Sequence, residues 1–142
     1  MTQGHTRRSR RGAAATEFAL VFPVLVALFA GMIDISWYLT HYHKITRIAQ
    51  DSVAIASHTY ENPQLHAPGS LALTAAQNHA LLSFDLQDLP CDPDICTISV
   101  SRSDDSLPIM TVAIQYEVEP IMGLILDSVN VSHSASAAYS YP

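Results

Sequence analysis

The first half of the chain is dominated by one long apolar run. Among residues 13–33 the single charged residue is Glu17. A helix rises about 1.5 Å per residue, so a helix over this run is about 30 Å long and matches the hydrocarbon core of a bilayer. The run therefore predicts a transmembrane helix. Pro23 lies inside it and predicts a kink or local melting, and Gly31 would let a second helix approach closely.

The helix is expected to continue beyond the membrane. After residue 33, apolar residues recur at spacings of three and four, which is typical of an amphipathic helix with one face on a core. We expect one helix from Ala13 to about Ser57, whose outer part, residues 34–58, is a stem. Its predicted core face consists of Ile35, Tyr38, Leu39, Tyr42, Ile45, Ile48, Ala49, Val53 and Ala56. Most of the polar residues fall off this face: Asp34, His41, Lys44, Arg47 and Asp51. Aromatic residues lie where a membrane-interface belt is expected: Trp37, Tyr38 and Tyr42.

The second half of the chain changes from a helical period to a strand period. A loop rich in Pro and Gly precedes a second expected helix over residues 71–84, which Ser70 can cap. Its predicted core side consists of Leu73, Ala76, Ala80, Leu81 and Phe84. Apolar and polar residues then alternate in three segments, which predicts three half-buried strands. The alternating residues are Cys96, Ile98 and Val100, then Val112, Ile114, Tyr116 and Val118, then Val129, Val131, His133, Ala135, Ala137 and Tyr139.

These elements predict an α+β fold. It consists of a long N-terminal transmembrane helix that continues into the stem, a second helix and a small three-stranded antiparallel sheet. The connection between the second and third strands is unusually apolar. We expect it to cover the open edge of the core; the alternative is an exposed patch that contacts a partner. The candidate contact residues are Ile121, Met122, Leu124 and Ile125.

The charge distribution separates the N-terminus from the rest. Residues 1–12 hold four of the seven basic residues and none of the 13 acidic ones. The remaining 130 residues hold three basic and 13 acidic residues, a net charge of −10, which argues against nucleic-acid binding. A basic flank beside a spanning helix stays in the cytoplasm. We therefore expect a cytoplasmic leader over residues 1–12, disordered on its own, and an extracytoplasmic domain over residues 34–142.

Two other uses of the N-terminus fit less well. A cleaved secretory signal peptide would need small residues before its cleavage site, but Leu28 stands at the −3 position relative to Ala30. The apolar run is also long, with Glu17 near its start. Ser9-Arg10-Arg11 superficially suggests a twin-arginine signal, and nothing downstream supports it.

Candidate chemistry is sparse. Cys91 and Cys96 lie in an Asp-rich loop without the partner residues of a zinc site, and in an extracytoplasmic domain a disulfide is the simpler interpretation. His41 and His43 do not share a helix face, and the acidic loop over residues 85–94 has no EF-hand spacing, so we expect no metal and no cofactor. The sequence has no P-loop and no nucleophile motif, which argues against an enzyme.

The N-terminal motif Arg10-Arg11-Gly12-Ala13-x-x-x-Glu17-Phe18 precedes a Pro-containing apolar helix. This motif resembles the N-terminus of TadE-like proteins, and TadF-like proteins share the leader. The more general likenesses are Asp34 after the helix, Ala75-Ala76-Gln77-Asn78, the cysteine pair, and the strand leading to Tyr116-x-x-x-Pro120. TadE-like proteins are minor pseudopilins of the tight-adherence (Flp) pilus system, a branch of the type IV pili.

The resemblance implies a processed assembly protein of the inner membrane. A prepilin peptidase, an aspartic protease, would cut between Gly12 and Ala13 on the cytoplasmic side. Glu17 would become the fifth residue of the mature chain and pair with the new terminal amine of a neighbouring subunit, since a carboxylate in hydrocarbon needs a positive partner. The implied partners are the peptidase, other pilin and pseudopilin subunits and pilus assembly proteins. The alternative is an unprocessed single-pass membrane protein whose extracytoplasmic domain binds a partner through residues 121–126.

Overall fold

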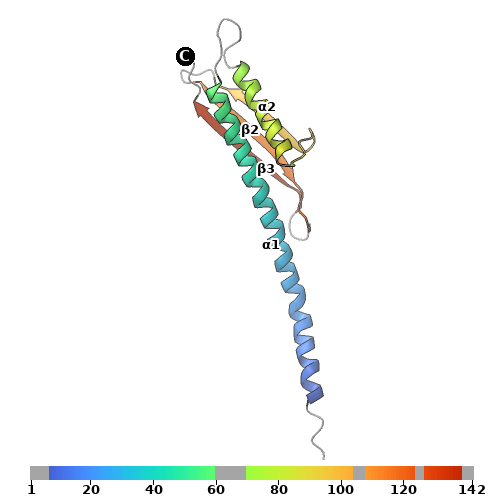
Figure 1. The fold of residues 1–142 in the computed structure, drawn as a ribbon. Helices are drawn as coiled ribbons and strands as arrows, with labels where there is room; N and C mark the ends of the chain where they lie inside the picture. Colours follow the sequence, from blue (N-terminus) through green and yellow to red (C-terminus); the bar gives the residue numbers. More distant parts are fainter. Residues whose placement is uncertain (1–6, 60–69, 104–107, 124–126, 139–142) are drawn as a thin grey trace, which may run out of the picture.

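A computed structural model describes residues 7–59, 70–103, 108–123 and 127–138, and for residues 7–13 it describes the backbone alone. The elements in chain order are α1 (Arg7–His58), α2 (Ser70–Leu86), β1 (Cys96–Arg102), β2 (Ile109–Val118) and β3 (Val129–Ala138). The strands form one antiparallel sheet in the order β1-β2-β3. The C-terminal half of α1 lies beside α2 and the sheet, and its N-terminal half extends away from them (Figure 1). The α+β fold predicted from the sequence is therefore confirmed.

The helix α1 is longer at its N-terminus than the sequence pattern predicted. It begins at Arg7, so the expected disorder of residues 1–12 is wrong for the part from Arg7 onward. Arginine is a good helix former and a single Gly12 costs only about 1 kcal/mol, so nothing in this segment forces the helix to stop. The helix also runs without interruption through Pro23, so the predicted local melting is wrong. Proline removes one backbone donor, and the rest of the hydrogen-bond ladder remains.

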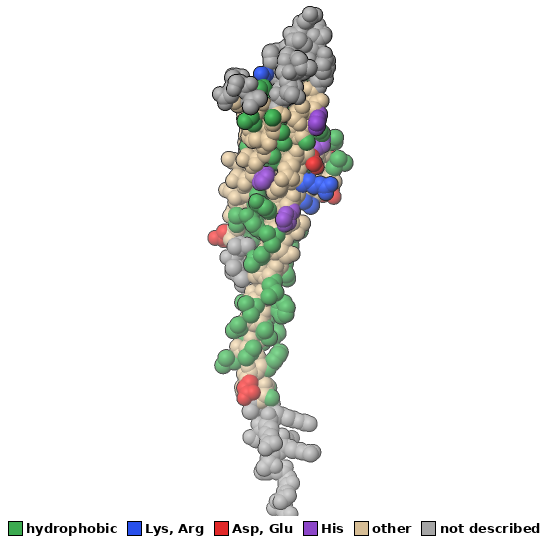
Figure 2. All heavy atoms as spheres, turned by 90° about the vertical axis from the view of Figure 1, so that its left-hand side faces the viewer, with side chains coloured by type: hydrophobic (Ala, Val, Ile, Leu, Met, Phe, Trp, Pro, Cys, Tyr) green, Lys and Arg blue, Asp and Glu red, His purple; other side chains and the backbone are tan. Residues whose placement is uncertain are grey.

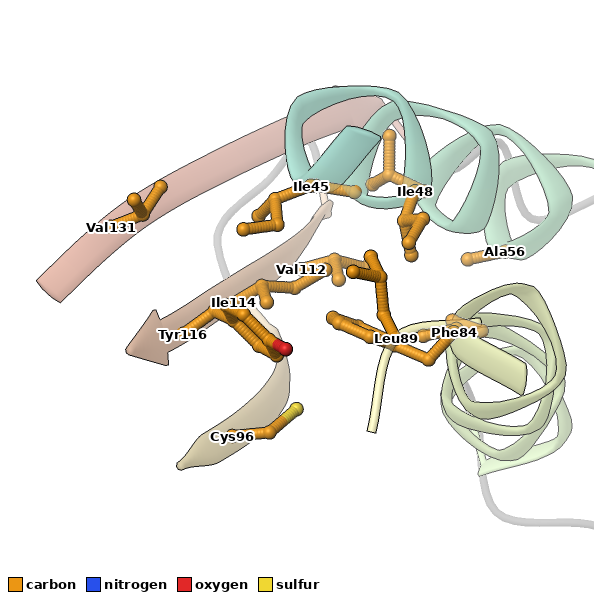
Figure 3. Close-up of a cluster of buried hydrophobic side chains, with 14 of the residues drawn as sticks. Ile45, Ile48, Ala56, Phe84, Leu89, Cys96, Val112, Ile114, Tyr116 and Val131 are labelled. Atoms are coloured by element: carbon orange, nitrogen blue, oxygen red, sulfur yellow. The ribbon is translucent and has the colours of Figure 1, made fainter. Parts of the chain in front are cut away.

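Both helices pack on the same face of the sheet. Figure 3 shows side chains from α1, α2 and all three strands converging on one cluster. The small residues of α2 recur at every fourth position and let α1 and the sheet approach that helix, while Phe84 at its end stacks on Tyr116 with ring centroids 5.8 Å apart. The fully buried hydrophobic residues include Ile45, Ile48, Ala49, Ala56, Ala72, Ala76, Ala80, Phe84, Met110, Val112, Ile114 and Val131.

The structure corrects the two predicted helix faces at several positions. On α1, the side chains of Ile35 and Leu39 are about half exposed, whereas Asp34 and His41 are buried. The covered face is therefore rotated toward the row that contains Asp34, Tyr38, His41 and Ile45. On α2, Leu81 is exposed and Ala72 is buried instead. The periodicity therefore predicted the buried face of each helix to within one residue, and the face that packs against the rest of the domain is the neighbouring row of side chains.

Candidate assembly site

The N-terminal half of α1 is an exposed apolar shaft, here defined as residues 14–33. Figure 2 shows hydrophobic side chains along the visible face of the helix below the domain. By length and composition α1 is able to cross a membrane, and Ala30 and Gly31 are the buried residues of the shaft. Its exposed large apolar side chains are Phe18, Leu20, Val21, Phe22, Val24, Leu25, Val26, Leu28, Phe29, Met32 and Ile33. Such a surface is unfavourable in water and fits hydrocarbon or another apolar helix.

Glu17 lies near the N-terminal end of this shaft. Its side chain is exposed, and within the described part of the chain it forms no ion pair and no hydrogen bond. The neighbouring Phe18 packs on Phe22, with ring centroids 5.5 Å apart, so the carboxylate is flanked by apolar surface. Gly12 and Ala13 lie in the same helix, one turn before it. Within the described side chains, no positive group therefore balances Glu17.

Asp34 stands at the junction between the shaft and the domain. Its side chain is 1% exposed, and its Oδ1 accepts a hydrogen bond of 2.9 Å from the backbone N–H of Met122. Its buried Oδ2 has no partner among the described residues. One turn later, the indole N–H of Trp37 donates to the carbonyl oxygen of Glu119 at 3.1 Å. These two bonds fix the segment after β2 against α1.

A second contact group holds α1 on the sheet. The Nδ1–H of His41 donates to the carbonyl oxygen of Trp37 at 3.0 Å, and its ring lies over Tyr116 at a centroid distance of 6.3 Å. Burial raises the pKa of the Tyr116 phenol above its ordinary value of 10.0. The ammonium group of Lys44 donates to the carbonyl oxygen of Gln87 at 3.2 Å. The aromatic and histidine side chains at the helix–sheet contact are therefore packing groups of the domain.

The other aromatic residues of the stem also belong to the domain. Tyr38 and Tyr42 are partly buried against the core, and Tyr42 meets the ring of His133 edge-on at 6.2 Å. The inward direction expected for His133 is consistent with this contact. Of the three aromatic residues expected at the membrane interface, Trp37 is the most open to solvent.

The apolar connection after β2 is exposed where the structure describes it. Ile121 and Met122 have about half of their surface open, and Ile121 lines a groove together with Phe29, Met32 and Trp37 of α1. The prediction that this connection covers the open edge of the core is therefore wrong for Ile121 and Met122. Leu124 and Ile125 lie outside the described residues. The exposed end of the connection is continuous with the shaft.

The structure contains the disulfide between Cys91 and Cys96, with Cα atoms 4.9 Å apart. It closes the loop between α2 and β1, in which Leu89 is buried in the core. Within the described ranges no group of three or more His, Cys, Asp or Glu side chains is arranged for a metal ion. The loop is held covalently at the edge of the core.

The sequence-predicted residues gather in two places. Gly12, Ala13, Glu17 and Phe18 lie near the free end of α1, and Ile121 and Met122 lie at the junction with the domain. About 17 helical residues, roughly 25 Å, separate the two places. The sequence pattern placed Asp34 and His41 off the core face, and the structure buries both. For Asp34, the spacing of four from Tyr38 was the available signal, because residues four apart share a helix face.

The comparisons with known proteins concern the helix α1, including the expected cleavage site at its free end. The family model of TadE-like proteins matches residues 12–53, so the resemblance seen in the sequence is confirmed over this segment. The match begins at Gly12 and ends at Val53, in the part of α1 that packs on the domain. Searches of curated proteins and of solved structures found no match.

Proposed function

We propose that this chain, whose residues 12–53 match the TadE-like proteins, is a minor pseudopilin that acts in the assembly of tight-adherence (Flp) type IV pili. The observation that carries the proposal is the position of the family match, which begins at the glycine of the expected cleavage site. The exposed apolar shaft that follows fits a single-pass membrane anchor. The role proposed is structural.

Processing is proposed between Gly12 and Ala13 by a prepilin peptidase. The cut would remove the arginine-rich leader and leave Ala13 with a free amine. Glu17 would then be the fifth residue of the mature chain. Its exposed carboxylate, without a partner in the described chain, supports pairing with the terminal amine of a neighbouring subunit, because an unpaired charge in hydrocarbon is costly. Gly12 lowers the cost of unwinding this part of α1 for cleavage, since glycine is a weak helix former.

The proposed topology follows from charge and cysteine chemistry. The leader, residues 1–12, is assigned to the cytoplasm, residues 13–33 to the inner membrane, and residues 34–142 to the periplasmic or extracytoplasmic side. The N-terminal arginines support the orientation of the helix. The disulfide supports an oxidising compartment for the domain. The partners proposed are the peptidase, other pilin and pseudopilin subunits and the assembly proteins of the pilus.

The mature N-terminus tests this proposal directly. The chain is expressed in cells that make the pilus, and the mass of its N-terminal peptide is measured. We expect a chain that starts at Ala13, and for Gly12→Val only the longer form, with Gly4→Val as a control that leaves processing unchanged. A chain that still carries the leader, or one that starts at residue 31, would contradict the proposal.

The role of Glu17 is tested separately. Glu17→Gln should abolish or reduce pilus formation without loss of the protein from the membrane, because the neutral amide removes the proposed ionic partner of the neighbouring amine. Asp51→Asn is the matched control, since Asp51 is an exposed acid of α1 on the domain side. Normal pili with Glu17→Gln, together with an intact leader, would favour the alternative of an unprocessed membrane protein with an extracytoplasmic binding domain. The exposed Ile121 and Met122 are the observation that supports that alternative.

A further inference from the structure

The exposed apolar surface of α1 does not end at Asp34. The charge of Asp34 suggested a membrane boundary after Ile33, yet the structure turns this carboxylate into the domain, where it is 1% exposed. On the outer side of the helix, Ile35 and Leu39 are about half exposed. The next charged residue of α1 is Lys44. An uncharged outer surface therefore continues along the helix beside the domain.

The segment after β2 extends this surface away from the helix. The bond between Asp34 and the N–H of Met122 places the segment beside the end of the shaft, and Figure 1 shows the end of β2 and the start of β3 at the end of the domain nearest the exposed half of α1. Ile121 borders the same groove as Phe29 and Met32. The side chains of Ile121 and Met122 point outward from it, 56% and 48% exposed. Helix and loop thus present one apolar surface.

We propose that Ile121 and Met122 insert into the headgroup–acyl boundary of the bilayer that α1 spans, so that two segments of the chain contact the membrane. This inference rests on the proposed membrane span. It is favoured over a protein partner by continuity, because the loop residues adjoin a shaft surface assigned to lipid. Trp37, at the groove, has an apolar ring and a satisfied N–H, which is typical of a side chain at the membrane interface.

The charges around the loop define the kind of lipid contact. The described charged residues next to it in sequence are Glu119 and Asp127, both acidic and exposed. Lys44 lines a pocket with Ile121 and Glu119, but its ammonium group is hydrogen-bonded to the carbonyl oxygen of Gln87. The acidic neighbours disfavour attraction to anionic headgroups, so apolar insertion is the proposed driving force. Neutral phospholipids should be sufficient. The bonds from Asp34 and Trp37 hold the loop at one height on α1, so insertion would set the angle of the domain relative to the membrane.

Depth-dependent fluorescence quenching tests the proposal on the full chain. Both native cysteines are in the disulfide, so an introduced cysteine is the single free thiol. Ile121→Cys, labelled with the dye NBD, is reconstituted into phosphatidylcholine vesicles that carry a nitroxide on the acyl chain, near the headgroup in one preparation and near the bilayer centre, for Leu25, in another. Met122→Cys is the second position. Leu82→Cys, on α2, is the matched control because Leu82 has the same exposed fraction of 56%, and Leu25→Cys reports the span itself.

We expect loss of NBD fluorescence at Ile121, Met122 and Leu25, and none at Leu82. Quenching at Leu25 without quenching at Ile121 and Met122 would overturn the inference and leave the span standing. The absence of quenching at Leu25 would overturn the span and the inference together. If the unlabelled Ile121→Cys chain forms a disulfide between two copies under an added oxidant and the labelled chain is not quenched, this surface is a protein interface and the inference is overturned. Quenching that requires added phosphatidylglycerol would contradict apolar insertion.

Discussion

Replacing Asp34 by alanine should release the segment after β2 from α1. The substitution removes the acceptor of the Met122 N–H, whose bond to Oδ1 is 2.9 Å long. A hydrogen bond to a charged acceptor contributes about 1.5–3 kcal/mol. The buried Oδ2 of the same carboxylate has no partner in the described chain, and its desolvation opposes this by about 1–3 kcal/mol. The two contributions nearly cancel in the global free energy of unfolding.

The exchange rate of the Met122 amide reports the loss of this hydrogen bond even where the global free energy of unfolding does not change. In the alanine variant the Met122 amide loses its acceptor whatever happens to the rest of the fold. A loss of about 1.5–3 kcal/mol corresponds to hydrogen exchange that is roughly 10- to 150-fold faster at this amide. Asp34→Asn is the matched control, since its side-chain oxygen remains an acceptor and should preserve most of the protection.

Hydrogen exchange of the full chain in detergent micelles measures this. The Glu117 amide, which donates to the carbonyl oxygen of Ile95 at 2.9 Å, is the internal reference because it lies in the sheet region. We expect faster exchange at Met122 and unchanged exchange at Glu117. Unchanged exchange at Met122 would refute the assigned role of Asp34. Equal acceleration at both amides would show that the substitution unfolds the domain rather than releasing one segment.

The remaining predictions concern the stability of the domain. Cys91→Ser together with Cys96→Ser should lower the free energy of unfolding by about 2 kcal/mol on the chain-entropy model, because the disulfide closes a short loop. Urea denaturation checks this, and reduction of the unmodified chain should give the same loss; no change in either would exclude a stabilising role. Stability should also fall as the pH rises above 10, since burial raises the pKa of Tyr116 and the unfolded chain ionises first. Tyr116→Phe should lose less stability than the unmodified chain over that pH range, and identical pH profiles would contradict this.

The sequence predicted most of the fold because its periods are local. The strand alternation placed all three strands, and the structure has them at Cys96–Arg102, Ile109–Val118 and Val129–Ala138. The second helix was predicted to within two residues at its C-terminal end. The start of α1 was wrong because arginines and one glycine are polar or flexible without stopping a helix. The lack of an amphipathic period does not exclude a helix, because helix-forming tendency is a separate property.

The candidate site also has a part that the sequence predicted and a part that it did not. The residues of the expected cleavage site form one short contiguous motif, and the family match at residues 12–53 begins with it. The spacing of the apolar residues predicts that Asp34 lies off the core face of the helix. Its actual surroundings include a backbone N–H that lies 88 positions further along the chain. No local pattern contains that contact.

The sequence by itself determined the elements of this protein, the apolar shaft and the position of the expected cleavage motif, because each depends on residues within a few turns of one another. Only the tertiary structure decided which row of α1 is covered, since β2 and the segment after it select one row among several apolar ones. That choice buries Asp34, leaves Ile35 and Leu39 open, and joins Ile121 to the apolar surface of the shaft. The physical reason is that burial is a property of a pair of surfaces, and the second surface comes from a distant part of the chain.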